Sequence, residues 1–372
     1  MKMNNNFFDK VASLIEQTRN VVGRTADLAM CVTYYEVGRM IVEHEQGGKA
    51  RADYGRGLMK ELSAYLAKRI GRGFSLTNLK NARKFYLIYA PSIQQTTYGE
   101  KGQSLTALFS APQKRQSLTD LFKVSWTHYV VLMRINREEE RSFYEIESAK
   151  QQWSVDDLKR QYHSSLYERL ALSRNKNEVM RLANEGHTLE KPRDLLKNPL
   201  VLEFLGMAED DSFSETDLES AIISKLQQFL LELGKGFLFE ARQKRFSFDE
   251  QSFFVDLVFY NRLLQCYVLI DLKTSELKHQ DLGQMQMYVN YFDRHVKTER
   301  EKPTVGILLC KEKNDSVVEL TLPKNSNIYA SEYSLYLPDK SLLQQKLNEW
   351  SQEFEEAKET MEAVTGTAFH HR

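Results

Sequence analysis

Two apolar runs in the second half of the sequence each carry a carboxylate near their centre. Asp256 lies within residues 253–259 and Asp271 within residues 268–273, and a short polar connection separates the runs. Runs of aromatic and β-branched residues of this length predict strands that are covered on both faces. A carboxylate in such a strand is costly unless it meets a partner. The pattern therefore predicts a hairpin in a covered sheet, with a polar site built around two acids.

The register of this hairpin decides how close the acids come. If pairing is centred between residues 263 and 264, Asp256 and Asp271 lie directly opposite each other, about 5 Å apart. A tighter turn at Asn261–Arg262 would offset them, so the sequence leaves the distance open. Because side chains alternate along a strand, Lys273 shares the face of Asp271.

An acid pair with a lysine beside it suits a divalent cation. Two carboxylates, a backbone carbonyl and waters form the oxygen site that Mg²⁺ or Mn²⁺ takes. A metal there lowers the pKa of a bound water and stabilises charge on a phosphoryl oxygen, and Lys273 is placed to orient that water or the phosphate. The alternative is a buried Asp–Lys ion pair, which is costly to desolvate and needs no second carboxylate. The residues favour a metal site at Asp256 and Asp271.

Three further polar residues lie on helices predicted next to the strands. Glu219 follows Thr216 by three residues, which is the spacing of a capping box. It also shares a face with the apolar stripe of its helix, so we expect a third metal ligand or a supporting acid that faces the sheet. Gln284 and Tyr288 lie four residues apart on one face of the helix predicted over 280–296; taken alone, packing is their simpler explanation.

Together these elements resemble the PD-(D/E)XK nuclease superfamily, and the Gln-x-x-x-Tyr spacing resembles its RecB-like branch. The stretches 254–260 (FVDLVFY), 283–285 (GQM) and 306–314 (GILLCKEKN) resemble more specifically the YhcG family of bacterial proteins. That family pairs such a nuclease domain with a helical N-terminal domain, and the resemblance covers nearly the whole chain.

The resemblance implies phosphodiester hydrolysis. It implies Asp256 and Asp271 as metal ligands, Lys273 as the group that orients water or stabilises charge, and Gln284 as a helper. Val255 replaces the proline of the superfamily's motif, and the second acid is Asp where relatives often have Glu. Neither change removes a ligand, but the shorter acid shifts the expected metal position by about a methylene.

The pattern along the chain predicts two domains, as its 372 residues suggest. Residues 1–172 have helical spacing of apolar positions, and 173–200 lose that periodicity and form the expected boundary. Residues 201–340 predict a restriction-endonuclease-like mixed sheet flanked by helices, and 341–372 an acidic helix and tail. No GxGxxG or Walker lysine loop is present, so a nucleotide-binding doubly wound fold is not expected.

The N-terminal half is basic and the C-terminal half acidic. Residues 1–200 hold 32 Lys and Arg against 22 Asp and Glu, whereas residues 201–372 hold 19 against 29. A basic half suits a polyanion, although chance distribution over solvated faces explains the charge split equally well.

A glycine turn followed by a basic helix lies within residues 51–100. This helix-turn-helix-like segment predicts phosphate contacts as from a recognition helix, with an ordinary solvated basic helix as the alternative. The expected nucleic-acid-binding residues are Arg72, Lys80, Arg83 and Lys84.

The rest of the sequence narrows the class of protein. No run approaches the ~18–20 apolar residues needed to span a membrane, and the N-terminus lacks a signal-peptide core, so we expect a cytoplasmic protein. Cys31, Cys266 and Cys310 form no CxxC pair and are expected as buried free thiols. The expected function is a metal-dependent nuclease acting on DNA. The alternatives are a nuclease-fold protein that binds DNA or a partner without turnover, and an enzyme directed at RNA; a homo-oligomer is left open.

Overall fold

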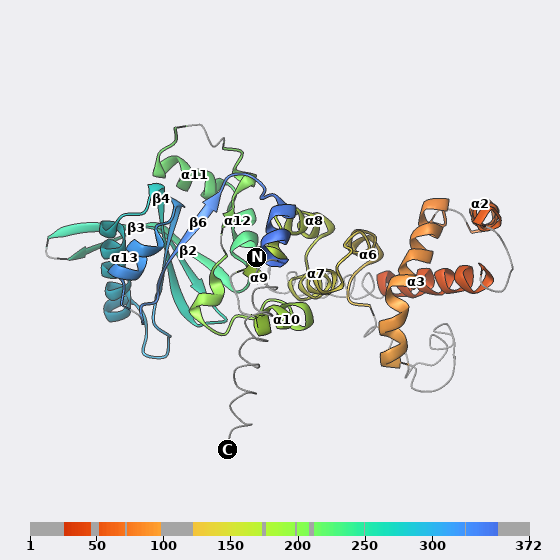
Figure 1. Cartoon of the computed structure of the whole chain (residues 1–372). Coiled ribbons are helices and arrows are strands. Elements are labelled where there is room, and N and C mark those ends of the chain that lie inside the picture. The colour runs from red at the N-terminus through yellow and green to blue at the C-terminus, as the bar shows by residue number, and fades with distance from the viewer. Residues whose placement is uncertain are drawn as a thin grey trace, which may run out of the picture. The chain divides into compact units, whose positions relative to one another are not determined.

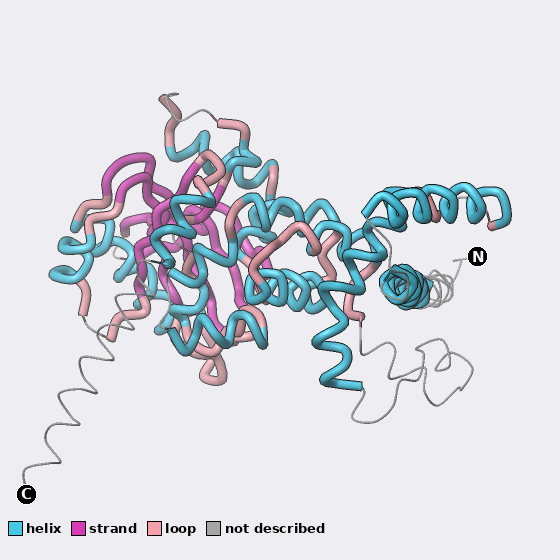
Figure 2. Tube along the Cα trace, turned by 45° about the vertical axis from the view of Figure 1, so that its right-hand side comes forward, coloured by secondary structure: helices cyan, strands magenta, loops and turns pink. Residues whose placement is uncertain are grey.

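The computed structural model describes residues 26–45, 52–70, 73–97, 122–172, 176–197, 199–207, 212–248, 250–323 and 325–348. The chain divides into two compact units, Met1–Lys159 and Arg160–Arg372. Figure 1 labels their elements, and Figure 2 shows that the strands belong to the second unit.

The described part of the first unit is made of helices and loops, as expected. Its helices are residues 26–45, α2 (Ala52–Arg69), α3 (Leu76–Thr97), α6 (Trp126–Leu132), α7 (Glu138–Gln151) and the first part of α8 (Val155–His163). Helix 26–45 approaches α3 so closely that a Cβ on Gly38 would lie 2.0 Å from the Ala82 carbonyl oxygen. The fully buried rings of Phe85 and Tyr129 pack against each other beside this contact.

One expectation for this unit is wrong. The sequence predicts a helix to about residue 89 and a breaker zone from Pro91, but α3 continues through Pro91 to Thr97. Pro91 lies on the exposed side of the helix, and the buried residues Leu79, Ala82 and Phe85 anchor the preceding turns. The loss of one hydrogen bond at the proline is therefore tolerated. The segment 98–121 lies outside the described residues.

The second unit contains a mixed six-stranded sheet with the order β1-β6-β5-β4-β3-β2. Its strands are β1 (Leu200–Val201), β2 (Phe237–Phe248), β3 (Gln251–Asn261), β4 (Cys266–Glu276), β5 (Val305–Glu312) and β6 (Ile328–Ser334). β2, β3 and β4 are antiparallel neighbours, and β4, β5, β6 and β1 pair in parallel. This confirms the predicted mixed sheet.

Helices cover both faces of the sheet (Figure 2). α11 (Glu215–Ser224) and α12 (Leu226–Leu233) bury their apolar side chains in one core cluster. α13 (His279–Tyr291), its π-helical extension η4 (Phe292–Val296) and α14 (Asp315–Thr321) pack in the other. α13 lies very close to β5, because a Cβ on Gly306 would lie 2.7 Å from the Met285 sulfur.

Several elements of this unit differ from the sequence prediction. The helix predicted over 216–233 is divided at Lys225, which leaves the helical region and lets both halves face one core. The segment expected to lack periodicity contains α10 (Lys176–Glu185), and Gly186 with a φ of 73° ends it. α14 was not predicted. The acidic C-terminal helix is described over 340–348, and its remainder lies outside the described residues.

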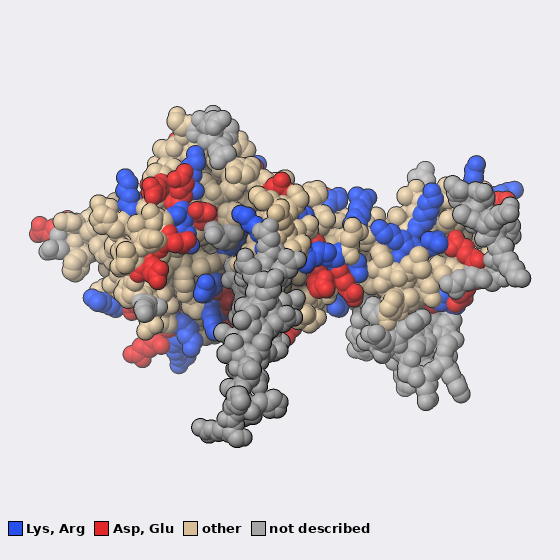
Figure 3. Space-filling model, in the orientation of Figure 1, with Lys and Arg blue, Asp and Glu red and all other residues tan. Residues whose placement is uncertain are grey.

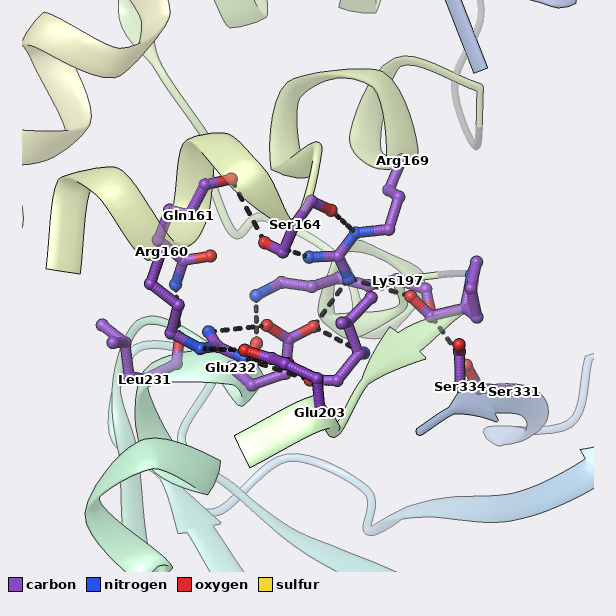
Figure 4. A network of polar contacts seen from close by, with 12 residues as sticks. Arg160, Gln161, Ser164, Arg169, Lys197, Glu203, Leu231, Glu232, Ser331 and Ser334 are labelled. Atoms are coloured by element: carbon purple, nitrogen blue, oxygen red, sulfur yellow. Dashed lines mark hydrogen bonds and ion pairs between the residues drawn. The ribbon is translucent and has the colours of Figure 1, made fainter. Parts of the chain in front are cut away.

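A buried ionic network joins α9 (Leu166–Leu172) to α12 (Figure 4). Arg169 and Glu232 have no exposed side-chain surface and lie 2.6 Å apart between Nη1 and Oε1. Arg160 reaches the other Glu232 oxygen at 3.1 Å, and Lys197 donates to the Glu232 carbonyl oxygen. Burial would raise the pKa of Glu232, but the charges of Arg169, Lys197 and Arg160 outweigh it and lower this pKa to about 2.

The thiols of Cys31, Cys266 and Cys310 are free and buried, as predicted. Within the described ranges, no helix combines the length and apolar character that a membrane crossing requires.

Candidate active site

The pairing of β3 and β4 brings the two predicted acids to adjacent strand positions. The ladder runs as far as the pair Leu257 and Ile270, and the next position along it would pair Asp256 with Asp271. The register is thus the one centred between residues 263 and 264. Of the two alternatives that the sequence leaves open, the structure has the one that places the acids opposite each other.

An amide side chain helps to hold the turn that sets this register. Asn261 pairs with Cys266 at the end of the ladder. Its Oδ1 accepts the backbone amides of Leu263 and Leu264, both at 3.1 Å. A side chain that caps its own turn in this way fixes a four-residue loop in place of the tighter two-residue turn.

The strands part at the two acids. Beyond Leu257, β3 pairs with β2 alone, whereas β4 continues beside β5. In the place of a ladder hydrogen bond, Oδ2 of Asp256 accepts the backbone amide of Leu272 at 2.8 Å. The carboxylate of Asp256 is therefore fixed at the point where the strands diverge.

Asp271 is buried, with 3% of its surface exposed, and faces charges of both signs. Lys273 Nζ lies 2.8 Å from Asp271 Oδ2 and 3.5 Å from Glu215 Oε2. Burial and the charge of Asp256 raise the pKa of Asp271 to about 7, although Lys273 opposes the shift. Burial would lower the pKa of Lys273, but its ion pair with Asp271 dominates and raises it. The lysine therefore stays charged.

The ion pair between Asp271 and Lys273, which the sequence offered as the alternative to a metal site, is present, but it leaves the charge of Asp256 unbalanced. Burial and the nearby charge of Asp256 raise the pKa of Asp271 in spite of the lysine, so one ammonium group does not balance the two acids. A site with an excess of carboxylate oxygen fits a hard divalent cation. Within the described residues, no group of three or more His, Cys, Asp or Glu side chains is arranged to hold a metal.

Glu219 lies on α11 and is 3% exposed. It is not part of a capping box with Thr216, because the N-cap lies two residues earlier: Ser214 is the N-cap and pairs reciprocally with Asp217. The carboxylate of Glu219 instead accepts from Arg242 and from the amide of Gln243. It thus faces the sheet, as expected.

Gln243 connects Glu219 to the acid pair. Its Nε2 also donates to Oδ1 of Asp256 at 3.0 Å, and its backbone has a φ of 47°. This position lies opposite Asp256, between the pairs Arg242–Leu257 and Lys244–Val255. The sequence interpretation missed Gln243, although the β2–β3 hairpin carries the signal: a register that closes at Phe248 and Gln251 brings residue 243 opposite residue 256. For Arg242 and Glu215 we find no sequence signal.

Gln284 and Tyr288 share one face of α13, and the Gln284 amide donates to the Tyr288 hydroxyl. Tyr288 is 1% exposed, whereas Gln284 is exposed. Burial raises the pKa of Tyr288; its hydrogen bond with Gln284 opposes this, and the charges of Asp271 and Asp256 add to it. Tyr288 therefore lies within electrostatic range of the acid pair.

The predicted nucleic-acid-binding residues lie in the first unit. Lys80 and Lys84 are exposed on α3, and Arg83 pairs with Glu45 at 2.8 Å. Arg72 lies outside the described residues. Figure 3 shows Lys and Arg side chains on the visible face of this unit, with Asp and Glu side chains among them.

Comparison with known proteins gives matches over both units. Residues 193–348 match a family model described as the YhcG PDDEXK nuclease domain, and residues 10–169 match the DUF1016 N-terminal domain. The YhcG protein of Escherichia coli (strain K12) is 39% identical over 347 residues, which cover 91% of this chain and 92% of that protein.

Two solved structures show weaker similarity. One is a repair endonuclease from Pyrococcus abyssi, with 19% identity, a TM-score of 0.24 and coverage of 35% of this chain and 50% of that one. The other is the complex of EndoMS with double-stranded DNA, with 16% identity, a TM-score of 0.25 and coverage of 36% and 49%. The chain thus spans about half of each of these proteins.

Proposed function

This chain belongs to the YhcG family and carries its PDDEXK nuclease domain, and from this premise we propose that it is a metal-dependent deoxyribonuclease. The observation that carries the proposal is the meeting of Asp256 and Asp271 where β3 and β4 part, with Lys273 beside them. The substrate is a phosphodiester bond in DNA.

Asp256 and Asp271 hold a Mg²⁺ or Mn²⁺ ion in this proposal. Such a cation, when bound, supplies an activated water and stabilises charge on the phosphoryl oxygen. The burial of Asp271 and the charge of Asp256, which raise the pKa of Asp271 although Lys273 pairs with it, support a cation at this point. Glu219 reaches Asp256 through Gln243, so it acts as a supporting acid that fixes the orientation of the first ligand.

Lys273 supplies the positive charge of the site. Its ion pairs with Asp271 and Glu215 keep it protonated and hold the ammonium group beside the acids. A fixed charge at this place stabilises the negative charge that develops on the phosphate or orients the attacking water. Gln284 and Tyr288 assist from α13, where their hydrogen bond fixes the pair as one unit.

The helical N-terminal domain, residues 1–172 in our proposal, binds the DNA backbone. The exposed side chains of Lys80 and Lys84 and the basic composition of residues 51–100 support this role, since basic side chains gain affinity by releasing counterions from phosphates. Arg83 contributes less because Glu45 already pairs with it, and Arg72 completes the proposed set. The nuclease domain then spans residues 201–340, and the enzyme works in the cytoplasm.

The test is a cleavage assay on linear, circular and single-stranded DNA and on RNA, with Mg²⁺, Mn²⁺ or EDTA. We expect the wild type to cut DNA only with metal, and Lys273→Ala and Asp271→Ala to lose at least about a hundredfold in rate. The matched control is Asp315→Ala, which removes an 83% exposed carboxylate on α14. If the wild type cuts nothing, or the site variants cut as well as the control, the proposal fails. Preferential cleavage of RNA would show that the substrate is RNA and not DNA.

A further inference from the structure

The β2–β3 hairpin continues past Asp256 as far as the pair Phe248 and Gln251, and it projects from the sheet (Figure 1). Beyond Asp256, β3 has lost its pairing with β4, so this part of the hairpin pairs with β2 alone. Strand side chains alternate between two faces. The register therefore places Arg245 opposite Phe254, and Ser247 opposite Ser252, on the face that carries Asp256 and Gln243.

The opposite face of the hairpin is anchored to the core. Phe246 is 7% exposed and stacks on Tyr291 with ring centroids 4.1 Å apart. It also meets Tyr288 edge-on at 5.6 Å. Because α13 holds this face, the first face keeps a fixed orientation relative to the acid pair.

Arg245 presents a charge that the described residues do not neutralise. Its guanidinium is held by the Ser252 hydroxyl, at 3.2 Å from Nε and 2.9 Å from Nη2. No carboxylate among the described residues pairs with it. By contrast, Lys244 points to the other face and reaches Glu240 at 3.5 Å. Arg245 is thus oriented by a neutral group and keeps its charge for an anion.

Phe254 leaves an aromatic ring open next to the acid pair. The side chain is 45% exposed, whereas the residues before and after it in the strand point to the other face and pack in the core. It lies two residues from Asp256, which is about 6.7 Å along a β-strand. This distance matches two nucleotide steps of about 3.4 Å along one DNA strand. An open ring beside an arginine is the combination that binds unpaired nucleotides by stacking and by charge.

We propose that Arg245 and Phe254 form a subsite for the nucleotides next to the scissile phosphate, and that this subsite takes an unpaired strand. The inference rests on the proposed nuclease function and deepens it. Arg245 binds a phosphate within about two steps of the bond that is cut, and Phe254 stacks on the adjacent base. A base inside a duplex has both faces covered by its neighbours, so the exposed ring selects single-stranded DNA.

Binding is measured without turnover, in the Asp271→Ala background, by fluorescence anisotropy with a labelled single-stranded oligonucleotide and its duplex. Phe254→Ala should weaken single-strand binding about tenfold and leave duplex binding unchanged, whereas Phe254→Trp should retain it. The control is Phe248→Ala, a 64% exposed ring on the other face of the hairpin. Equal losses for both variants, or for both DNA forms, overturn the proposal.

The proposed contact between Arg245 and a phosphate is tested by removing the charge of individual phosphates. In a series of oligonucleotides, one phosphate at a time is replaced by an uncharged methylphosphonate. One replacement should weaken binding about tenfold in the parent and have no effect in Arg245→Ala, while Lys244→Ala should show the parent's pattern. If the penalty persists at every position in Arg245→Ala, Arg245 contacts no phosphate. Both tests of the subsite measure binding. Absence of DNA cleavage would therefore contradict the nuclease proposal without contradicting the subsite.

Discussion

Asp256 accepts the backbone amide of Leu272 across the point where β3 and β4 stop pairing, at 2.8 Å. A side chain here replaces a backbone ladder bond, so the position of the carboxylate is set by the sheet itself. The other acid, Asp271, has no such anchor and depends on Lys273. The two halves of the site therefore respond differently to substitution.

Asp256→Asn should lower the pKa of Asp271 from about 7 towards its ordinary value. The asparagine oxygen can still accept the Leu272 amide, and the burial that raises the pKa of Asp271 remains, but the negative charge that raises it further is gone. The measurement is a carbon NMR titration of the Asp271 carboxyl group. Asp315→Asn serves as the control and should not move it. An unchanged titration would mean that burial alone sets this pKa.

Metal affinity should fall as the pH decreases below about 7. The pKa of Asp271 is raised to about 7, so the metal-free protein carries a proton on this group below that pH, and the proton must leave before a cation binds. The apparent affinity for Mn²⁺ should drop about tenfold per pH unit below 7 and level off above it. Calorimetric titrations at several pH values check this; a flat profile between pH 5 and 7 contradicts it.

Gln243→Gly should weaken metal binding or activity by about 10- to 100-fold without destabilising the fold. Glycine adopts the φ of 47° at this position without strain, so only the amide that joins Glu219 to Asp256 is lost. The matched control is Glu250→Gly, which changes another residue of positive φ, at the hairpin turn. Comparable activity in the two variants would show that the bridge is dispensable.

Glu232→Gln should destabilise the second unit by about 3–5 kcal/mol at pH 7, because it leaves buried Arg169 without its anion. The pKa of Glu232 is lowered from 4.5 to about 2, so its contribution is fully present above pH 4.5 and is lost as the pH falls towards 2. Urea unfolding at pH 7, 4 and 3 should show the gap between wild type and variant closing. A constant gap would assign the loss to packing.

Gly306→Ala should destabilise the sheet unit by about 1–3 kcal/mol. The added methyl would lie 2.7 Å from the Met285 sulfur and 3.0 Å from a methyl of Val289, so α13 must shift, and Gln284 with it. Thermal unfolding of the single and double variants gives the test. In a Met285→Ala background the same change should cost less; an equal cost would place the strain elsewhere.

The acid pair could largely be predicted from the sequence, whereas most of the residues that hold it in place could not. Asp256, Asp271 and Lys273 stand out because charges in apolar strands need partners, and the side-chain period of strands sets their faces. Gln243 was missed because β2 is exposed along most of its length, so no apolar contrast marks its one functional amide. Glu215 reaches Lys273 only through the placement of α11, which the helix's own pattern does not contain.

The fold was predictable to a similar degree. The mixed sheet follows from the apolar runs and the helix between them, and it is observed. Pro91 was interpreted as a helix breaker, but it lies inside α3, whereas Gly186 does end α10. The buried side chains of α3 decide its extent, and the presence of a proline alone does not indicate them.

The buried pair of Arg169 and Glu232 has an evolutionary consequence. The match to the N-terminal family model ends at residue 169 and the match to the nuclease model begins at residue 193, so the two partners belong to different halves of the gene product. A recombinant that took the halves from parents lacking either partner would inherit an uncompensated charge in its interior. The two halves are therefore not freely interchangeable between relatives, and a recombinant that folds must contain both Arg169 and Glu232.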